Sequence, residues 1–142
     1  MNFKRLLKTA VNASIEGGHA IMKVYASNFA VEHKDDKSPL TLADKNCNTV
    51  IERFLSNTNI PVLSEEGAKI SFEERKKWEY FWLVDPLDGT KEFIKRNGEF
   101  TVNIALIYNG SPVMGVIYVP VKEDLYFAMD GLGSYKTNRS IT

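Results

Sequence analysis

The chain has 142 residues, of which 44% are hydrophobic and 25% charged, a balance typical of one globular domain. Its formal net charge of zero indicates no partner of the nucleic-acid class, and its single cysteine, Cys47, excludes an intrachain disulfide. No segment approaches the roughly 18 apolar residues of a membrane span, and no N-terminal run is long enough for a signal peptide. We therefore expect a cytoplasmic protein, with peripheral attachment at the inner membrane as an alternative.

The N-terminal segment predicts a long amphipathic helix. Between Phe3 and Tyr25, apolar side chains recur at helical spacing. The pair Gly17-Gly18 weakens this helix by about 1 kcal/mol per glycine relative to alanine. Close packing of the helix against another element would justify that cost.

A charged segment separates this helix from the next. Phe29–His33 could form a short strand, and Lys34–Pro39 is either a solvated loop or a lid whose lysines steer an anion. A second helix is then expected to begin at Thr41. It would place Asp44 in its first turn, where the helix dipole already favours an acidic residue.

Two short buried strands are each followed by carboxylates. Ile60–Leu63 precedes Ser64-Glu65-Glu66-Gly67, and the apolar run Tyr80–Val84 reads as a strand covered on both faces. Pro86 should end the second strand, because proline has no N–H to donate to a neighbouring strand. Asp85 would then lie at the strand tip and Asp88 in a tight turn.

A short helical segment follows this turn. Gly89-Thr90 opens it, Lys91–Arg96 forms it, and Asn97-Gly98 closes it. Free N–H groups at a helix start attract anions, and Mg²⁺ takes carboxylate and phosphate oxygens, so the segment predicts a metal and phosphate site. The structural alternative is that Asp88 only caps the helix and that Asp85 only ends a strand.

The last third of the chain predicts an antiparallel meander. Phe100–Tyr108, Val113–Val119 and Leu125–Ala128 are rich in β-forming residues, and Asn109-Gly110 and Asp130-Gly131 are strong hairpin signals. Three or four antiparallel strands are expected. No helical pattern follows to cover the final strand edge.

Three motifs in this order resemble the inositol monophosphatase superfamily. They are Ser-Pro-Leu-Thr-x-Ala-Asp at 38–44, Leu-Ser-Glu-Glu at 63–66, and the run from Trp82 to Phe93. The continuation from Ile94 to Leu106 looks most like the 3′(2′),5′-bisphosphate nucleotidase branch. The resemblance implies an α+β fold, a layered sandwich of the sugar-phosphatase type with a mostly antiparallel sheet, in a single domain over residues 1–142.

The resemblance also implies roles for individual residues. The main-chain carbonyl of Leu87 and three carboxylates would bind two or more Mg²⁺ ions, and Glu66 would stand just behind them. Asp44 and Thr90 would orient the attacking water, with Glu65 also catalytic, and Gly89 would hold the phosphate together with Thr90. The metal ligands would be Glu65, Leu87, Asp85 and Asp88, and the substrate contacts Glu65, Leu87, Asp88, Gly89 and Thr90.

The implied function is Mg²⁺-dependent hydrolysis of adenosine 3′,5′-bisphosphate to AMP and phosphate, in sulfate assimilation. Two alternatives stay open: an inositol monophosphate phosphatase, and a non-catalytic remnant that binds metal or phosphate. The resemblance covers only the N-terminal part of the family's domain, since the family's Trp-Asp-x-Ala-Ala-Gly motif is not found in the sequence. We therefore expect residues 1–142 alone to bind metal weakly, to hydrolyse little substrate and to self-associate through an uncovered sheet edge.

Overall fold

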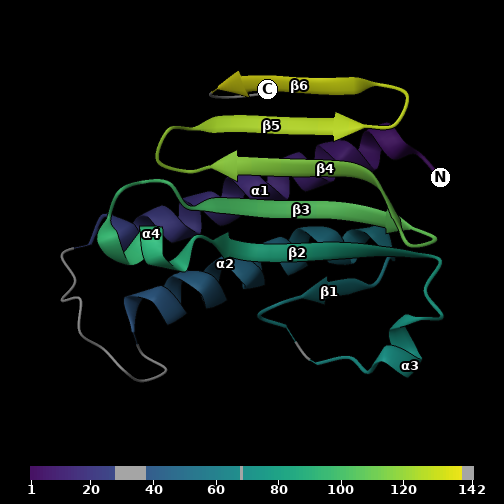
Figure 1. The fold of residues 1–142 in the computed structure, drawn as a ribbon, viewed down its shortest axis with the longest axis horizontal. Coiled ribbons are helices and arrows are strands. Elements are labelled where there is room, and N and C mark those ends of the chain that lie inside the picture. Colours follow the sequence, from purple (N-terminus) through teal and green to yellow (C-terminus); the bar gives the residue numbers. More distant parts are fainter. Residues whose placement is uncertain (28–37, 68, 139–142) are drawn as a thin grey trace.

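Two long helices cover one face of a six-stranded sheet in the computed structural model, which describes residues 1–27, 38–67 and 69–138 (Figure 1). The predicted α+β fold with a largely antiparallel sheet is confirmed: the strands lie in chain order, and only β1 and β2 pair in parallel. The helices are α1 (Phe3–Tyr25), α2 (Pro39–Leu55), α3 (Phe72–Arg75) and α4 (Thr90–Lys95), with a 3₁₀ turn η1 (Ser56–Thr58). The strands are β1 (Val62–Ser64), β2 (Tyr80–Asp88), β3 (Thr101–Tyr108), β4 (Ser111–Val119), β5 (Asp124–Met129) and β6 (Gly133–Asn138).

The glycine pair of α1 allows the helix to approach two neighbours. A Cβ added to Gly17 would lie 2.9 Å from the Cys47 Sγ of α2, and one added to Gly18 would lie 2.6 Å from the Tyr118 ring of β4. Both separations are too short for a methyl group. The sequence-based explanation of Gly17-Gly18 is therefore confirmed, because helix propensity is given up for close packing against α2 and the sheet.

The second helix begins two residues earlier than predicted. The Ser38 hydroxyl accepts a hydrogen bond from the Thr41 N–H at 3.1 Å, and Pro39 occupies the first helical position. Asp44 therefore lies in the second turn, and its predicted place in the first turn is wrong. The predicted strand Phe29–His33 and residues 34–37 of the charged run lie outside the described residues.

The predicted meander is confirmed. Strands β3 to β6 pair successively as antiparallel neighbours, and the fourth strand follows the Asp130-Gly131 turn. Asn109 and Gly110 both have positive φ, 47° and 81°, as a tight hairpin with a matched twist requires.

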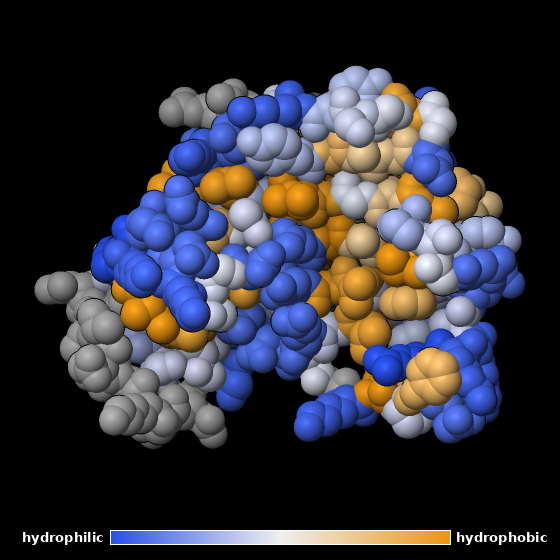
Figure 2. Space-filling model, viewed as in Figure 1, coloured by the Kyte–Doolittle hydropathy of each residue, from blue (hydrophilic) through white to orange (hydrophobic). Residues whose placement is uncertain are grey.

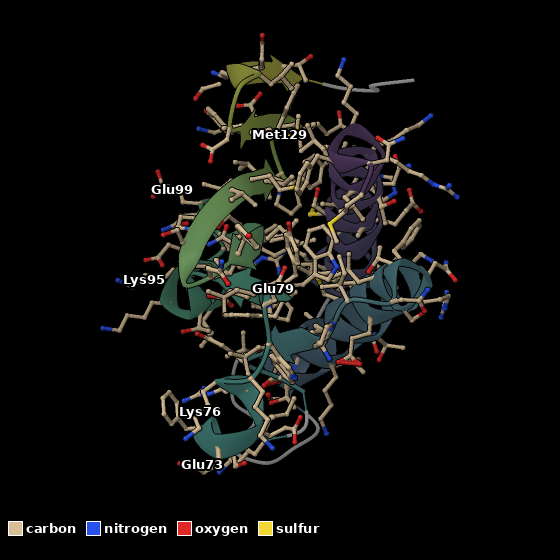
Figure 3. All side chains as sticks on the ribbon, turned by 90° about the vertical axis from the view of Figure 1, so that its right-hand side faces the viewer. Glu73, Lys76, Glu79, Lys95, Glu99 and Met129 are labelled. Atoms are coloured by element: carbon tan, nitrogen blue, oxygen red, sulfur yellow. The ribbon has the colours of Figure 1, made fainter. Side chains whose placement is uncertain are left out.

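The two faces of the sheet differ in their cover. Turned by 90°, the molecule shows α1 and α2 on one side of the strands, whereas Lys95 and Glu99 extend on the other side (Figure 3). The covered face holds the core, in which Val102, Ile104 and Leu106 of β3 are buried. Among the described residues, no helix has the length and apolar character needed to cross a membrane.

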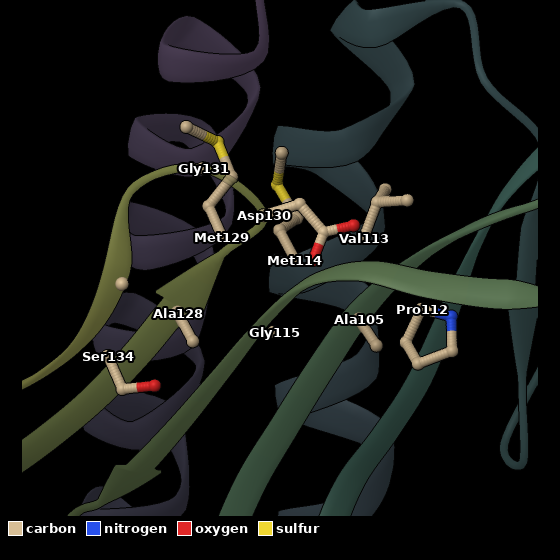
Figure 4. A pocket seen from close by; sticks show the side chains of 11 residues that line it. Ala105, Pro112, Val113, Met114, Gly115, Ala128, Met129, Asp130, Gly131 and Ser134 are labelled. Carbon is tan, nitrogen blue, oxygen red and sulfur yellow. The ribbon is translucent and has the colours of Figure 1, made fainter.

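The outer face of the sheet carries apolar side chains without cover from the described helices. A row of small residues pairs from strand to strand beside two hollows of about 460 and 440 Å³, the first of which is drawn in Figure 4. Hydrophobic residues form a band across this face (Figure 2). The predicted burial of β2 on both faces is therefore wrong, since Leu83 is 43% exposed here. The row consists of Ala105, Gly115, Ala128 and Ser134, and the exposed apolar side chains of this face are Leu83, Ile117 and Tyr126.

Candidate active site

Strand β2 continues through Pro86, contrary to the prediction that it ends there. Asp85 pairs with Asn103 and Asp88 pairs with Thr101, so three steps along β2 match two along β3. This register shift is a β-bulge, a place where proline is tolerated because one residue needs no ladder hydrogen bond. In a regular strand, residues three apart face opposite sides. The bulge therefore returns Asp88 to the same side of the sheet as Asp85.

The end of β1 brings two further carboxylates to this place. Ser64 pairs in parallel with Val84, and the Glu65 N–H donates to the Val84 carbonyl at 3.3 Å. Glu65 is the residue after Ser64 and Asp85 is the residue after Val84, so the two acidic residues lie side by side on neighbouring chains. The Ser64 hydroxyl accepts from the Glu66 N–H at 3.3 Å and donates to Asn48 of α2. This turn therefore holds both glutamates between β2 and α2.

Asp44 comes to the same cluster from α2. Its Oδ1 atom is buried and has no hydrogen-bond partner among the residues that the structure describes. Burial raises the pKa of Asp44 to about 7, and the charges of Glu66, Asp85 and Glu65 add to this rise, as does a hydrogen bond with Glu66. A buried oxygen without a partner is rare in folded proteins and points to a missing ligand.

Asp85 is perturbed for the same reasons. Burial raises its pKa to about 6, and the charges of Glu65 and Asp88 contribute next, against the lowering effect of a hydrogen bond from the Leu87 N–H. Cys47 of α2 lies near Asp44 and Asp85, and its thiol donates to the Pro86 carbonyl at 3.2 Å. Burial, with the charges of Asp44 and Asp85, raises the thiol pKa, so Cys47 is a core residue and not a nucleophile.

Nothing in the described parts of the chain neutralises this negative charge. The ion pairs there involve other residues, and no lysine, arginine or histidine within the described ranges pairs with the five carboxylates. Nor are three acidic, histidine or cysteine side chains of these ranges arranged as ready ligands around one point. Mutual repulsion opposes such convergence. The oxygen-only donors and the orphaned Asp44 Oδ1 fit a hard divalent cation such as Mg²⁺.

Helix α4 begins directly after Asp88. Gly89 has φ of 99°, and a Cβ there would lie 3.2 Å from the Phe100 Cα, so only glycine fits this turn. Within the described ranges no side chain caps the helix start, which leaves backbone N–H groups of its first turn available to an anion. The helix starts at Thr90, one residue before the predicted range. Among the described residues, no hydrogen bond joins the Thr90 side chain to that of Asp44.

The far end of α4 is held against α1. Phe93 is fully buried, with its ring 5.5 Å from that of Tyr25 and 5.3 Å from that of Phe100. Arg96 ends the helix at φ of 58°, so the predicted closure at Asn97-Gly98 is wrong by one residue, and its guanidinium donates to the Tyr25 carbonyl at 2.8 Å. These contacts fix the direction in which the Gly89-Thr90 end points.

Sequence reasoning overlooked Thr101 and Asn103. The Asn103 amide donates to Asp88 Oδ2, and the Thr101 hydroxyl donates to Asn103 Oδ1, both at 2.9 Å. The available signal was two polar residues at alternate positions of an otherwise apolar strand. Their link to Asp88 depends on the pairing of β2 with β3.

The free energy of unfolding of the metal-free chain is expected to fall as pH rises from about 4 to about 7. Unfolded aspartates titrate near 3.9, whereas Asp44 and Asp85 in the folded chain titrate near 7 and 6. Between those values the folded chain binds more protons, so each pH increase favours the unfolded state. Urea unfolding at pH 5 and pH 8 with a chelator measures the difference. Asp44→Asn should reduce it, and Asp130→Asn in the β5–β6 turn should not; equal pH dependence in Asp44→Asn and the parent chain would contradict the assignment.

The chain is similar in sequence and in fold to known proteins. Residues 2–142 match the model of the inositol monophosphatase family. The chain is 51% identical over 130 residues to the 3′(2′),5′-bisphosphate nucleotidase CysQ of Salmonella typhimurium, covering 89% of this chain and 52% of that protein. The solved structure of CysQ from Bacteroides thetaiotaomicron has a TM-score of 0.93 at 51% identity, covering 98% of this chain and 51% of that one. Inositol monophosphatase from Anabaena has a TM-score of 0.79 at 28% identity, covering 100% and 50%. The chain therefore spans about half the length of the curated relatives it matches.

Proposed function

Because this chain belongs to the inositol monophosphatase family, we propose that residues 1–142 are the N-terminal part of a Mg²⁺-dependent phosphomonoesterase. The proposed reaction is hydrolysis of adenosine 3′,5′-bisphosphate to AMP and phosphate, a step of sulfate assimilation. The names of relatives at 51% identity support a bisphosphate nucleotide as substrate. The observation that carries the proposal is a group of carboxylates from α2, β2 and the turn after β1, beside the start of α4. No described lysine, arginine or histidine pairs with these carboxylates, and no described side chain caps that helix start.

The family resemblance supports a proposed role for each residue of the group. Glu65, Asp85, Asp88 and the Leu87 carbonyl would hold the cations, and Gly89 and Thr90 would bind the phosphate through the first turn of α4. Bound divalent ions would supply a water of lowered pKa and would offset the charge of the leaving oxygen.

Asp44 and Thr90 would orient the attacking water. Burial and the neighbouring carboxylates raise the pKa of Asp44 to about 7 in the metal-free chain, and bound cations would lower it, so that Asp44 would act as a carboxylate that accepts a hydrogen bond. The Thr90 hydroxyl can accept from the water and donate to a carboxylate. Glu65 would contact the same water, and Glu66 would orient Asp44, whose carboxyl it already meets.

One alternative has specific support. The Anabaena structure named inositol monophosphatase shares the fold at 28% identity, which makes an inositol monophosphate the alternative substrate. The other alternative, a remnant that binds metal or phosphate without turnover, is distinguished from both by the assay that follows.

The function is tested by joining residues 1–142 to the second half of the Salmonella typhimurium relative and measuring phosphate release. We expect hydrolysis of adenosine 3′,5′-bisphosphate that exceeds hydrolysis of inositol monophosphate and stops when a chelator removes Mg²⁺. Residues 1–142 alone serve as the comparison, since we expect at most one weakly bound ion and negligible turnover.

Each other result points to a different account. Preference for inositol monophosphate supports the first alternative, and a folded fusion that is inactive on both substrates supports the second. Turnover by residues 1–142 equal to that of the fusion would show that the second half is dispensable.

Light scattering of residues 1–142 should show self-association through the β6 edge and the adjoining apolar face, and a monodisperse monomer would contradict this.

A further inference from the structure

Asn103 links β3 to the proposed metal ligand Asp88. Its Nδ2 donates to Asp88 Oδ2 at 2.9 Å, and its Oδ1 accepts from the Thr101 hydroxyl at 2.9 Å. Val102 and Ile104, on either side of it, point into the core, so Asn103 points to the opposite face. Thr101 and Asn103 therefore stand together beside the bulge that places Asp85 and Asp88 on one side.

The direction of this chain of hydrogen bonds follows from the groups themselves. A carboxylate oxygen can only accept, so Asn103 must turn its NH₂ group toward Asp88. Its carbonyl oxygen is then left for a donor, and the Thr101 hydroxyl supplies one. The Asp88 carboxylate thus sets which way the Asn103 amide faces, and the Thr101 hydroxyl holds that amide in place, so that the amide can fix one orientation of Asp88.

The two aspartates of the bulge are held by different groups. Asn103 lies directly opposite Asp85 in the strand register, yet its amide donates to Asp88, one bulge further along. Asp85 instead accepts from the Leu87 N–H. Each carboxylate therefore has its own hydrogen-bond donor.

The Asn103–Asp88 contact is suited to orientation more than to stability. Asp88 is exposed and Asn103 half-buried, so water can replace the hydrogen bond when it is lost. Fixing a ligand's direction has a larger effect on a metal site, because groups that hold the ligands typically change metal affinity by about 10- to 100-fold.

We propose that Asn103 is a positioning residue for Asp88, with Thr101 holding its amide in place, so that Asp88 presents one carboxylate orientation to a divalent cation. This proposal rests on the proposed function of the same site. It concerns side chains of the described structure and can be tested without turnover.

The first test is the side-chain conformation of Asp88 in residues 1–142, measured by NMR couplings that report χ1. We expect one dominant rotamer in the parent chain and averaged couplings in Asn103→Ala. Thr101→Val, which replaces the hydroxyl by a methyl group of similar size, should also cause averaging, and Thr101→Ser, which keeps the hydroxyl, should show the parent couplings. Ser134→Ala, on the same face of the sheet, is the matched control. Unchanged Asp88 couplings in Asn103→Ala, or equal averaging in Ser134→Ala, would overturn the proposal.

The second test is a Mg²⁺ titration of the same proteins, followed by the Gly89 amide signal. We expect Asn103→Ala to raise the dissociation constant for Mg²⁺ about 10-fold while the urea midpoint stays close to that of the parent. Thr101→Ser should bind as the parent does. Parent-like Mg²⁺ affinity in Asn103→Ala would overturn the role toward the cation. If no protein responds to Mg²⁺ while Asn103→Ala still frees Asp88, the proposed function fails for this chain and the positioning contact stands.

Discussion

Asp88→Asn is expected to lower kcat by orders of magnitude in the fusion of residues 1–142 with the second half of the Salmonella typhimurium relative, while the fold of the fusion stays intact. The change replaces one carboxylate oxygen by an amide, which removes a charged ligand from the proposed metal site. Asp88 is exposed and contributes no core contact, so stability has little reason to fall. The loss should appear in phosphate release from adenosine 3′,5′-bisphosphate at saturating Mg²⁺.

The matched control is Asp130→Asn, the same exchange at an exposed aspartate in the β5–β6 turn. It should leave kcat and the urea midpoint unchanged. Near-parent turnover of Asp88→Asn at saturating Mg²⁺ would remove Asp88 from the site. A large fall in the urea midpoint would instead assign its effect to folding.

The second large effect is expected from Asp44 and Thr90 acting as one unit. If Thr90 passes a proton between the attacking water and Asp44, each single loss removes the whole relay, which is worth about 10²- to 10⁴-fold in rate. Asp44→Asn and Thr90→Ala should each reduce kcat within that range. The double variant should be little worse than the poorer single variant, as for residues that share one task.

A double-mutant cycle on the same fusion protein measures this coupling. Thr90→Ser should retain much of the activity because it keeps the hydroxyl. Losses that simply add in the double variant would break the proposed pair. Within the described part of the chain the two side chains share no hydrogen bond, so the cycle tests a contact that substrate and metal would have to complete.

Local pattern was sufficient where neighbours in the sequence are neighbours in space. The helix Phe3–Tyr25 has its predicted bounds, because apolar spacing within one helix reports its buried face directly. The β3–β6 meander follows from Asn109-Gly110 and Asp130-Gly131, since each hairpin is set by its own turn. The three motifs also predicted the family correctly, because each of them is a contiguous run of residues.

Local pattern was misleading where a distant partner decides the conformation. Pro86 has the residue preferences of a strand end, yet β3 pairs with β2 on both sides of it and makes it part of a bulge. Leu83 lies in an apolar run that suggested burial on both faces, but the described helices pack on the other face only. The predicted helix start at Thr41 put Asp44 in the first turn, where the helix dipole would explain it. The helix instead begins at Pro39 with Ser38 as its N-cap, so Asp44 lies beyond the first turn.

The sequence by itself determined the elements, their order, the family and the identity of the acidic residues, because these depend on composition, periodicity and motif. Only the tertiary structure decided which carboxylates face one another, that the bulge places Asp85 and Asp88 on one side, and that Asn103 holds Asp88. The physical reason is strand register: it is set by pairing between β2 and β3 across an intervening helix. A one-residue change in that pairing reverses the side on which each residue points.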